Sequence, residues 1–319
     1  MTMNSRLPLA RGFSITELMV ALVLGGFIIA GVVGVYVANV RTAQVQQNLM
    51  QLQQNSQIAF TVLNKDVIHA GFSGCANMIT QRVVNVLNVP LPWWSIWTGG
   101  IRGFDQGAVP AMAAGITPLT TADAVHLMYG RGSSASVVSH SLAANPPLVV
   151  NQAAVAGIRA NDVVVACDSR MAVIFQVTAL AANSISHAVG AGTPGNASTN
   201  FGVGANGVAI AQSLSPDAGT VMPLESVGWF VGTANGVTSL YRVALNNGQM
   251  QAEQMIRGVT DFQLQYLVRG AASYVNAAAV TDWEQVVAMR ATLVLAQNSQ
   301  MPIAVGYRTF TAVMNLRNH

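Results

Sequence analysis

The amino-acid sequence predicts an α+β protein in which one long N-terminal helix packs on an antiparallel β-sheet. An uncharged apolar run from Leu18 to Val37 continues into a three-four spacing of apolar residues that extends to about Ile68, and this is the pattern of a helix. From Asn161 onward, segments rich in Val, Ile, Phe, Tyr and Thr alternate with breaks of Gly, Asn and Pro, as in a sheet of short strands. The 319 residues suffice for one large or two modest domains.

The composition limits the class of partner. Hydrophobic residues make up 52% of the chain and charged residues only 8%, which suits a subunit packed into an assembly. Without Arg6 and Arg11, which precede the apolar run, 13 basic and 12 acidic side chains remain. Lys65 is the only lysine, and no run of basic residues is interleaved with aromatic ones. We therefore expect no nucleic-acid partner.

The apolar run is long enough to cross a membrane. Its 20 residues, at about 1.5 Å per residue, would span roughly 30 Å, the thickness of a bilayer core. A secretory signal peptide usually has a shorter apolar region that ends at an A-x-A-like cleavage site, and Tyr36, two residues before Ala38, spoils that site. We predict one transmembrane helix.

The flanking charges orient this helix. Arg6 and Arg11 precede the run and only Arg41 follows it closely, so the positive-inside rule places the N-terminus in the cytoplasm. Everything after Val40 then faces outward.

One acidic residue, Glu17, lies just inside the apolar stretch. An ionised carboxylate costs on the order of 2.5 kcal/mol or more at mid-membrane, and less near the interface. Two interpretations stay open at this point: Glu17 reaches the lipid head groups, or it has a partner.

The residues around Glu17 favour a partner. The sequence Arg11-Gly12-Phe13-Ser14-Ile15-Thr16-Glu17-Leu18 resembles the type III signal of type IV prepilins and pseudopilins, in which a short basic leader ends in Gly, Phe follows, and a Glu stands four positions later. The resemblance implies that a prepilin peptidase cleaves between Gly12 and Phe13 and methylates the new amino group of Phe13. It also implies that Glu17 faces that amino group on a neighbouring subunit and sets the subunit's register.

The helix is expected to continue beyond the membrane as an amphipathic segment, and Gly71 supplies a stop. Its apolar or small face follows a three-four spacing: Val45, Leu49, Leu52, Ser56, Ala59 and Leu63. The predicted organisation is a leader over residues 1–12, a transmembrane helix over 13–40, an amphipathic helix over 41–70 and a β-rich head domain over 71–319.

Strands are predicted mainly in the second half of the chain. They cover Asp162 to Ala166, Met171 to Leu180, Val221 to Val231, Ser239 to Leu245, Gly258 to Leu267, Met289 to Ala296 and Tyr307 to Leu316. Residues 80–160 and 188–220 are rich in Gly, Ala, Ser, Asn and Pro and are interpreted as long loops with short strands, including Ala124 to Tyr129.

Cys75 and Cys167 are an even pair in the part of the chain expected outside the cytoplasm. A disulfide between them is the prediction, and two buried free thiols are the alternative.

Several outer segments resemble the PilW group of minor pilins. These are residues 70–75 (AGFSGC), 163–168 (VVVACD), 256–266 (IRGVTDFQLQY), Trp283 with Val286, Val287 and Arg290, 307–310 (YRTF) and 315–318 (NLRN). The resemblance implies a minor pilin that takes part in initiating type IV pilus assembly at the tip. It also implies an inner-membrane precursor with a periplasmic head domain that later joins the cell-surface pilus.

The implied partners are the prepilin peptidase, other minor pilins, the major pilin, the inner membrane and, as a further candidate, a tip adhesin. A minor pseudopilin of a type II secretion system would share every N-terminal feature and is the alternative function.

The sequence offers no catalytic motif. His69, His126, His140, His187 and His319 are scattered singly, without H-E-x-x-H or metal-ligand spacing, and we expect surface or capping roles for them. Walker A and G-x-S-x-G motifs are also missing, and no G-x-G-x-x-G follows a predicted strand. Gly202-Val203-Gly204 lies in a Gly-rich loop that is interpreted as a flexible connection. We predict no cofactor, no metal and no enzymatic activity, whereas a membrane-tethered enzyme or receptor would need convergent acids or metal ligands.

Trp93, Trp94 and Trp97 lie close together near Pro90 and Pro92. They form either a small local core or an exposed aromatic contact for a neighbouring subunit or ligand.

Overall fold

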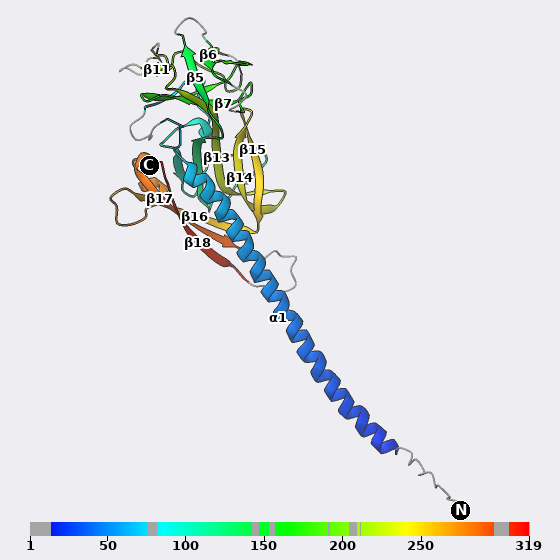
Figure 1. The fold of residues 1–319 in the computed structure, drawn as a ribbon. Helices are drawn as coiled ribbons and strands as arrows, with labels where there is room; N and C mark the ends of the chain where they lie inside the picture. The colour runs from blue at the N-terminus through cyan, green and yellow to red at the C-terminus, as the bar shows by residue number, and fades with distance from the viewer. Residues whose placement is uncertain are drawn as a thin grey trace, which may run out of the picture. The chain divides into compact units, whose positions relative to one another are not determined.

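The computed structural model describes residues 14–75, 82–141, 147–152, 157–190, 192–203, 209–210, 212–296 and 306–318 (Figure 1). The chain divides into two compact units inside its long helix, one reaching Gln51 and the other beginning at Leu52. The second unit contains the last part of the helix and all of the described strands.

The predicted long helix is present as α1, Ile15–His69, a single element of 55 residues. No proline interrupts it, and the backbone at Gly71 has a φ of +80°, which ends it. Glycine adopts this left-handed conformation without the penalty that a Cβ brings. The observed end is one residue beyond the predicted Ile68.

Among the described residues, thirteen strands form one sheet, and two smaller sheets accompany it. The large sheet contains β1 (Arg82–Asn85), β2 (Ile101–Phe104), β3 (Thr117–Pro118), β4 (Ala124–Gly130), β5 (Ala135–His140), β6 (Leu148–Val150), β7 (Val163–Cys167), β8 (Met171–Gln176), β9 (Ala179–Ala181), β10 (Ser184–Ser186), β13 (Thr220–Ala234), β14 (Val237–Asn246) and β15 (Gln249–Arg257). The three-stranded sheet contains β16 (Val259–Val268), β17 (Val286–Leu295) and β18 (Arg308–Asn315), and the two-stranded sheet β11 (Gly202–Val203) and β12 (Ala209–Ile210). Short 3-10 turns lie at η1 (Trp93–Ser95), η3 (Ala277–Ala279) and η4 (Trp283–Gln285).

Strand β13 connects the parts of the large sheet. Residues 220–223 pair with β7 and residues 224–230 with β4. Residues 227–234 pair with β14 on the edge opposite β4, and β15 follows β14 (Figure 1). This strand is 15 residues long, so it reaches both the region near the helix and the region near the disulfide.

The seven predicted strands are present with small shifts at their ends, except that residues 171–180 divide into β8 and part of β9. The predicted antiparallel pairing is present in all of the paired strands described except β1 and β8, which pair in parallel. Residues 80–160 and 188–220, interpreted as loops with short strands, contain β1 to β6, β11 and β12 within their described parts.

The last part of α1 packs against the strands of its own unit. Leu52, Ser56, Ala59 and Leu63, all on the predicted stripe, are buried, whereas Val45 and Leu49 are half-buried. Leu52, Ala59 and Leu63 join a core cluster with residues of β4, β13, β16 and β17. The amphipathic pattern therefore identified the face that the sheets cover.

Candidate functional site

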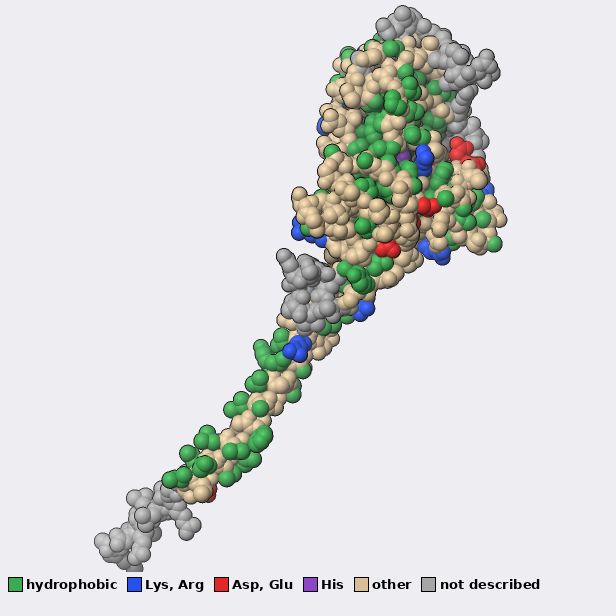
Figure 2. All heavy atoms as spheres, turned by 180° about the vertical axis from the view of Figure 1, so that it is seen from behind, with side chains coloured by type: hydrophobic (Ala, Val, Ile, Leu, Met, Phe, Trp, Pro, Cys, Tyr) green, Lys and Arg blue, Asp and Glu red, His purple; other side chains and the backbone are tan. Residues whose placement is uncertain are grey.

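The first part of α1 exposes apolar side chains on all sides. An 18-residue window with a mean hydropathy of 2.7 has none of its residues buried, and Figure 2 shows hydrophobic side chains spread along this part of the helix. Within the described chain this is the one helix long and apolar enough to cross a membrane. A helix that is apolar on every face needs a lipid or protein environment around it.

Glu17 caps the start of this helix. Its Oε2 accepts a hydrogen bond from the backbone N–H of Ser14 at 3.2 Å, and Ser14 precedes the first helical residue. This is one half of a capping box, in which a Glu at the third helical position bonds back to the N-cap. Gly12 and Phe13, the predicted cleavage site, lie outside the described residues.

Near its other end, α1 carries a buried acid that holds it to the large sheet. Asp66 is 2% exposed, and its carboxylate accepts from Tyr129 Oη at 2.8 Å and from Trp229 Nε1 at 2.8 Å. Arg242 adds a bidentate contact, with Nε and Nη2 at 2.8 and 3.0 Å. One helical carboxylate thus binds side chains from β4, β13 and β14, and charge-assisted bidentate pairs of this kind are strong.

The charge network continues from Arg242 toward the surface. Arg242 Nη2 lies 3.4 Å from Glu225 Oε1, and Arg131 Nε lies 3.0 Å from Glu225 Oε2. Burial raises the pKa of Glu225, while both arginines oppose that rise. Burial also raises the pKa of Tyr129, and the negative charge of Asp66 raises it further. The phenol is therefore a donor to Asp66 at any ordinary pH.

The C-terminal segment caps the same helix end. Asn318 Nδ2 lies 3.3, 3.4 and 3.0 Å from the backbone oxygens of Ile68, His69 and Ala70. Carbonyls at a helix C-terminus lack intrahelical partners. Asn318 therefore supplies a donor to them from about 250 residues away in the sequence.

The predicted disulfide is present. Cys75, shortly after α1, is bonded to Cys167 at the end of β7, with a Cα–Cα distance of 5.9 Å. Next to it, Asp168 accepts bonds from Arg170 and from the backbone N–H groups of Met171 and Ser215. Burial acts to raise the pKa of Asp168, but these donors lower it to about 2.

The tryptophans belong to a local core, which was one of the two interpretations. Trp94 is buried, and Trp93 and Trp97 are half-buried and pack against the same cluster. Ser226 donates to the carbonyl of Trp94 at 2.7 Å. Trp93 meets His126 edge-on, with 5.1 Å between ring centroids.

The prediction of surface or capping roles was wrong for three histidines. His126, His140 and His187 are buried, because each packs against aromatic neighbours in the sheet. His140 and His187 lie 5.5 Å apart between ring centroids, and both contact Phe201. Burial lowers the pKa of His187 to about 4, and it lowers that of His140 as well.

His69 is exposed at the end of α1, with Nδ1 2.7 Å from the carbonyl of Lys65, which fits a capping role. His319 lies outside the described residues. Across the described ranges, no group of three or more His, Cys, Asp or Glu side chains is arranged to hold a metal ion.

The family model described as PilW, type IV pilus-assembly protein W, matches residues 229–318. That range begins within β13 and contains β14 to β18, Arg242 and Asn318. In this C-terminal range the chain is similar to the PilW family. The matched segment includes three residues whose side chains donate to α1, namely Trp229, Arg242 and Asn318. Within the described residues, the long helix and the mostly antiparallel sheets form an α+β fold.

No curated protein matches this chain. Among solved structures, it is similar to a type IV-like pilin from Thermus thermophilus, with a TM-score of 0.32 and 9% identity. The similarity covers 84% of this chain and 96% of that one.

Sequence reasoning missed the Asp66 network. A signal for it exists, because Asp66 continues the three-four spacing of the apolar face, three residues after Leu63. A charged side chain on a buried stripe needs a partner. The sequence does not say that the partner is Arg242, which is 176 residues away.

Proposed function

We propose that this chain is a minor pilin that takes part in initiating type IV pilus assembly and is located at the pilus tip. A prepilin peptidase removes residues 1–12 and methylates the amino group of Phe13. The role is structural and not catalytic, and it requires no cofactor.

The observation that carries this proposal is the exposed apolar helix with one acid at its start. Before assembly the helix lies in the inner membrane, with the head domain in the periplasm. In the filament the same apolar surface packs against other subunits, so one segment serves both environments. The PilW match of the C-terminal part supports the same assignment.

Glu17 acts as the register device in this proposal. In the single chain its carboxylate is exposed and accepts from Ser14 N–H. A carboxylate can accept several bonds, so it can also pair with the Phe13 amino group of a neighbouring subunit. In a low-dielectric surrounding this charge pair is much stronger than in water, and it fixes how far one subunit rises against the next.

The proposed partners are the prepilin peptidase, other minor pilins and the major pilin, with a tip adhesin as a further partner. The alternative function is a minor pseudopilin of a type II secretion system, for which the same helix would serve.

Deletion of the gene in the native cell distinguishes the two functions. We expect few or no surface pili, normal protein secretion, and recovery on complementation with the full chain. Immunogold labelling of the complemented strain should place the protein at pilus ends. A normal number of pili together with lost secretion would instead assign the pseudopilin role.

A further inference from the structure

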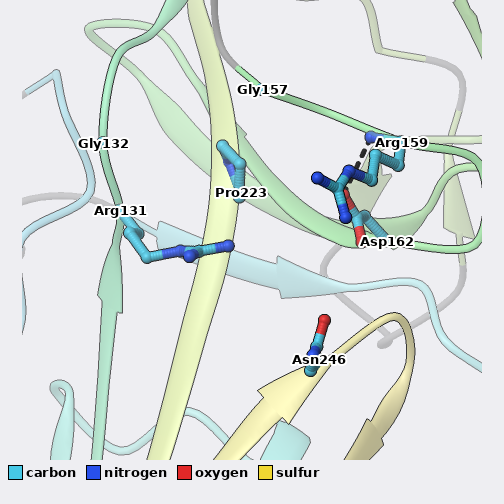
Figure 3. A pocket seen from close by; sticks show the side chains of 7 residues that line it. All are labelled: Arg131, Gly132, Gly157, Arg159, Asp162, Pro223 and Asn246. Atoms are coloured by element: carbon cyan, nitrogen blue, oxygen red, sulfur yellow. Dashed lines mark hydrogen bonds between the residues drawn. The ribbon is translucent and has the colours of Figure 1, made fainter.

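A polar pocket lies on the second unit. Its volume is about 280 Å³, and it is bounded by the loop after β4, the loop before β7 and the β14–β15 hairpin. Arg131, Arg159, Asp162 and Asn246 line it (Figure 3). No aromatic side chain is among its described lining residues, so its chemistry is that of hydrogen bonds and charge.

Two guanidinium groups approach the pocket from opposite sides (Figure 3). Arg131 is held in place, because its Nε binds Glu225 at 3.0 Å and its backbone N–H donates to Pro223 O at 2.8 Å. Arg159 lies on the other wall and is exposed. Among the described residues it forms no ion pair within 4.0 Å. Planar guanidinium groups are suited to bind a carboxylate.

The pocket also offers acceptors. Asn246 uses its Nδ2 to donate to Gln251 at 3.0 Å, and its amide oxygen points into the pocket (Figure 3). Asp162 accepts from the backbone N–H of Arg159 through Oδ2 at 2.8 Å, which orients its carboxylate. Both groups can accept from hydroxyls.

The entrance to the pocket is open at two glycines. Gly132 and Gly157 have positive φ values of 74° and 66°, and a Cβ at either would meet no atom within 4 Å. Side chains therefore do not close the entrance at these points. One unit of a longer chain could therefore enter with its binding groups inside the pocket and its bonds to the neighbouring units outside.

We propose that this pocket binds a hydroxylated carboxylic acid of monosaccharide size, the class of the uronic acids. The carboxylate binds the guanidinium groups of Arg131 and Arg159, and hydroxyl groups donate to Asp162 and Asn246. A plain inorganic anion would use only the arginines. An apolar ligand would take these four polar groups out of water without offering them hydrogen bonds, which is unfavourable.

Saturation-transfer difference NMR on the full-length protein in detergent micelles tests this proposal with D-glucuronate as the probe. D-Glucose, which lacks the carboxylate, and inorganic sulfate, which lacks the hydroxyls, are the comparison probes. We expect saturable transfer to glucuronate and at least fivefold weaker binding of glucose. Sulfate should also compete weakly. The sulfate concentration that halves the transfer to glucuronate should be at least fivefold higher than the glucuronate concentration that half-saturates the site.

Three variants locate the site. Arg159→Gln and Asn246→Ala should each weaken glucuronate binding at least fivefold, whereas Arg257→Gln, an exposed arginine at the end of β15, should leave it unchanged. Circular dichroism and the thermal midpoint check that each variant is folded. No saturable transfer in the parent, or equal binding in Arg159→Gln and Arg257→Gln, overturns the proposal. Sulfate competition as strong as that of glucuronate overturns the hydroxyl part and identifies an anion site alone.

Discussion

Arg242 on β14 joins Asp66 of the N-terminal helix to Glu225 of β13, with shortest distances of 2.8 and 3.4 Å. The helix is therefore fixed to the sheet by a buried ion pair as well as by apolar packing. Buried ion pairs do not always add net stability, but removing one partner leaves an uncompensated buried charge. The cost of removing one partner can therefore be measured even if the whole pair adds little net stability.

Substitution Asp66→Ala should destabilise the second unit by about 3 to 5 kcal/mol, because the guanidinium of Arg242 would lose its bidentate partner and keep only the longer contact to Glu225. Tyr129 and Trp229 would each lose an acceptor too. Urea unfolding of the full chain in detergent micelles, followed by tryptophan fluorescence, measures the change. Asp217→Asn, at an exposed position, is the control and should change stability little.

The double variant Asp66→Ala with Arg242→Met tests whether the loss of stability comes from the unpaired charge of Arg242. We expect it to be more stable than Asp66→Ala alone, because no buried charge is left unpaired. If Asp66→Ala unfolds at the same urea concentration as Asp217→Asn, the account of the network is wrong.

Acid should weaken the fold through the buried histidines. The pKa of His187 in the folded protein, about 4, lies below its ordinary value of 6.5, so the unfolded chain binds a proton that the folded chain does not. Stability is then full above about pH 6.5 and falls as the pH drops toward 4, by roughly 2 kcal/mol from this group at pH 5. Below that range, protonation of Asp168, with its pKa of about 2, removes more.

Urea midpoints at pH 7.5 and 5 measure this loss. His187→Leu should lose less stability between the two pH values than the parent, and His69→Gln, at an exposed histidine, should lose as much as the parent. Equal losses in the parent and in His187→Leu would show that His187 does not titrate in this way.

Patterns local in sequence were predicted well from the sequence, whereas long-range pairings, apart from the disulfide between Cys75 and Cys167, were not. The length of α1 and its buried stripe of Leu52, Ala59 and Leu63 follow from hydrophobic spacing alone. Strand β15 was missed because Gln and Glu dominate it. Asn247-Gly248 before it is a two-residue hairpin signal, and both residues have positive φ, 50° and 76°. Recognising that turn would have predicted the strand.

The features of the candidate site also differ in whether the sequence could predict them. Glu17 was singled out by its local motif, and the Cys75–Cys167 bond was predicted from the even number of cysteines in a part of the chain expected outside the cytoplasm. The cap that Asn318 provides and the burial of His140 and His187 depend on contacts between distant segments, and a single sequence carries no direct signal for these. The capping bond from Ser14 to Glu17 was accessible, because Ser14-Ile15-Thr16-Glu17 fits the capping-box pattern.

Substitution can separate the capping bond of Glu17 from its proposed role in setting the register. Glu17→Gln keeps an oxygen for the Ser14 N–H but removes the charge, whereas Glu17→Ala removes both. If the charge pair with Phe13 sets the register, both variants should be processed and inserted normally, since removal of a charge eases insertion, and both should be depleted from filaments.

Immunoblots of sheared filaments, with a cleavage assay and a membrane-fraction blot, compare the variants with the parent. Ser14→Ala, which leaves the charge of Glu17 in place, should reach filaments normally. Filament levels of Glu17→Gln equal to those of the parent would assign Glu17 to helix capping and remove its role in registration.

The intact mass of the mature protein from its native cell tests the central claim most directly. The account predicts a chain that begins at Phe13, has lost residues 1–12 and carries one added methyl group on its amino terminus. A mature protein that retains Met1, or one cut after the apolar run so that α1 loses its membrane-spanning part, would contradict it.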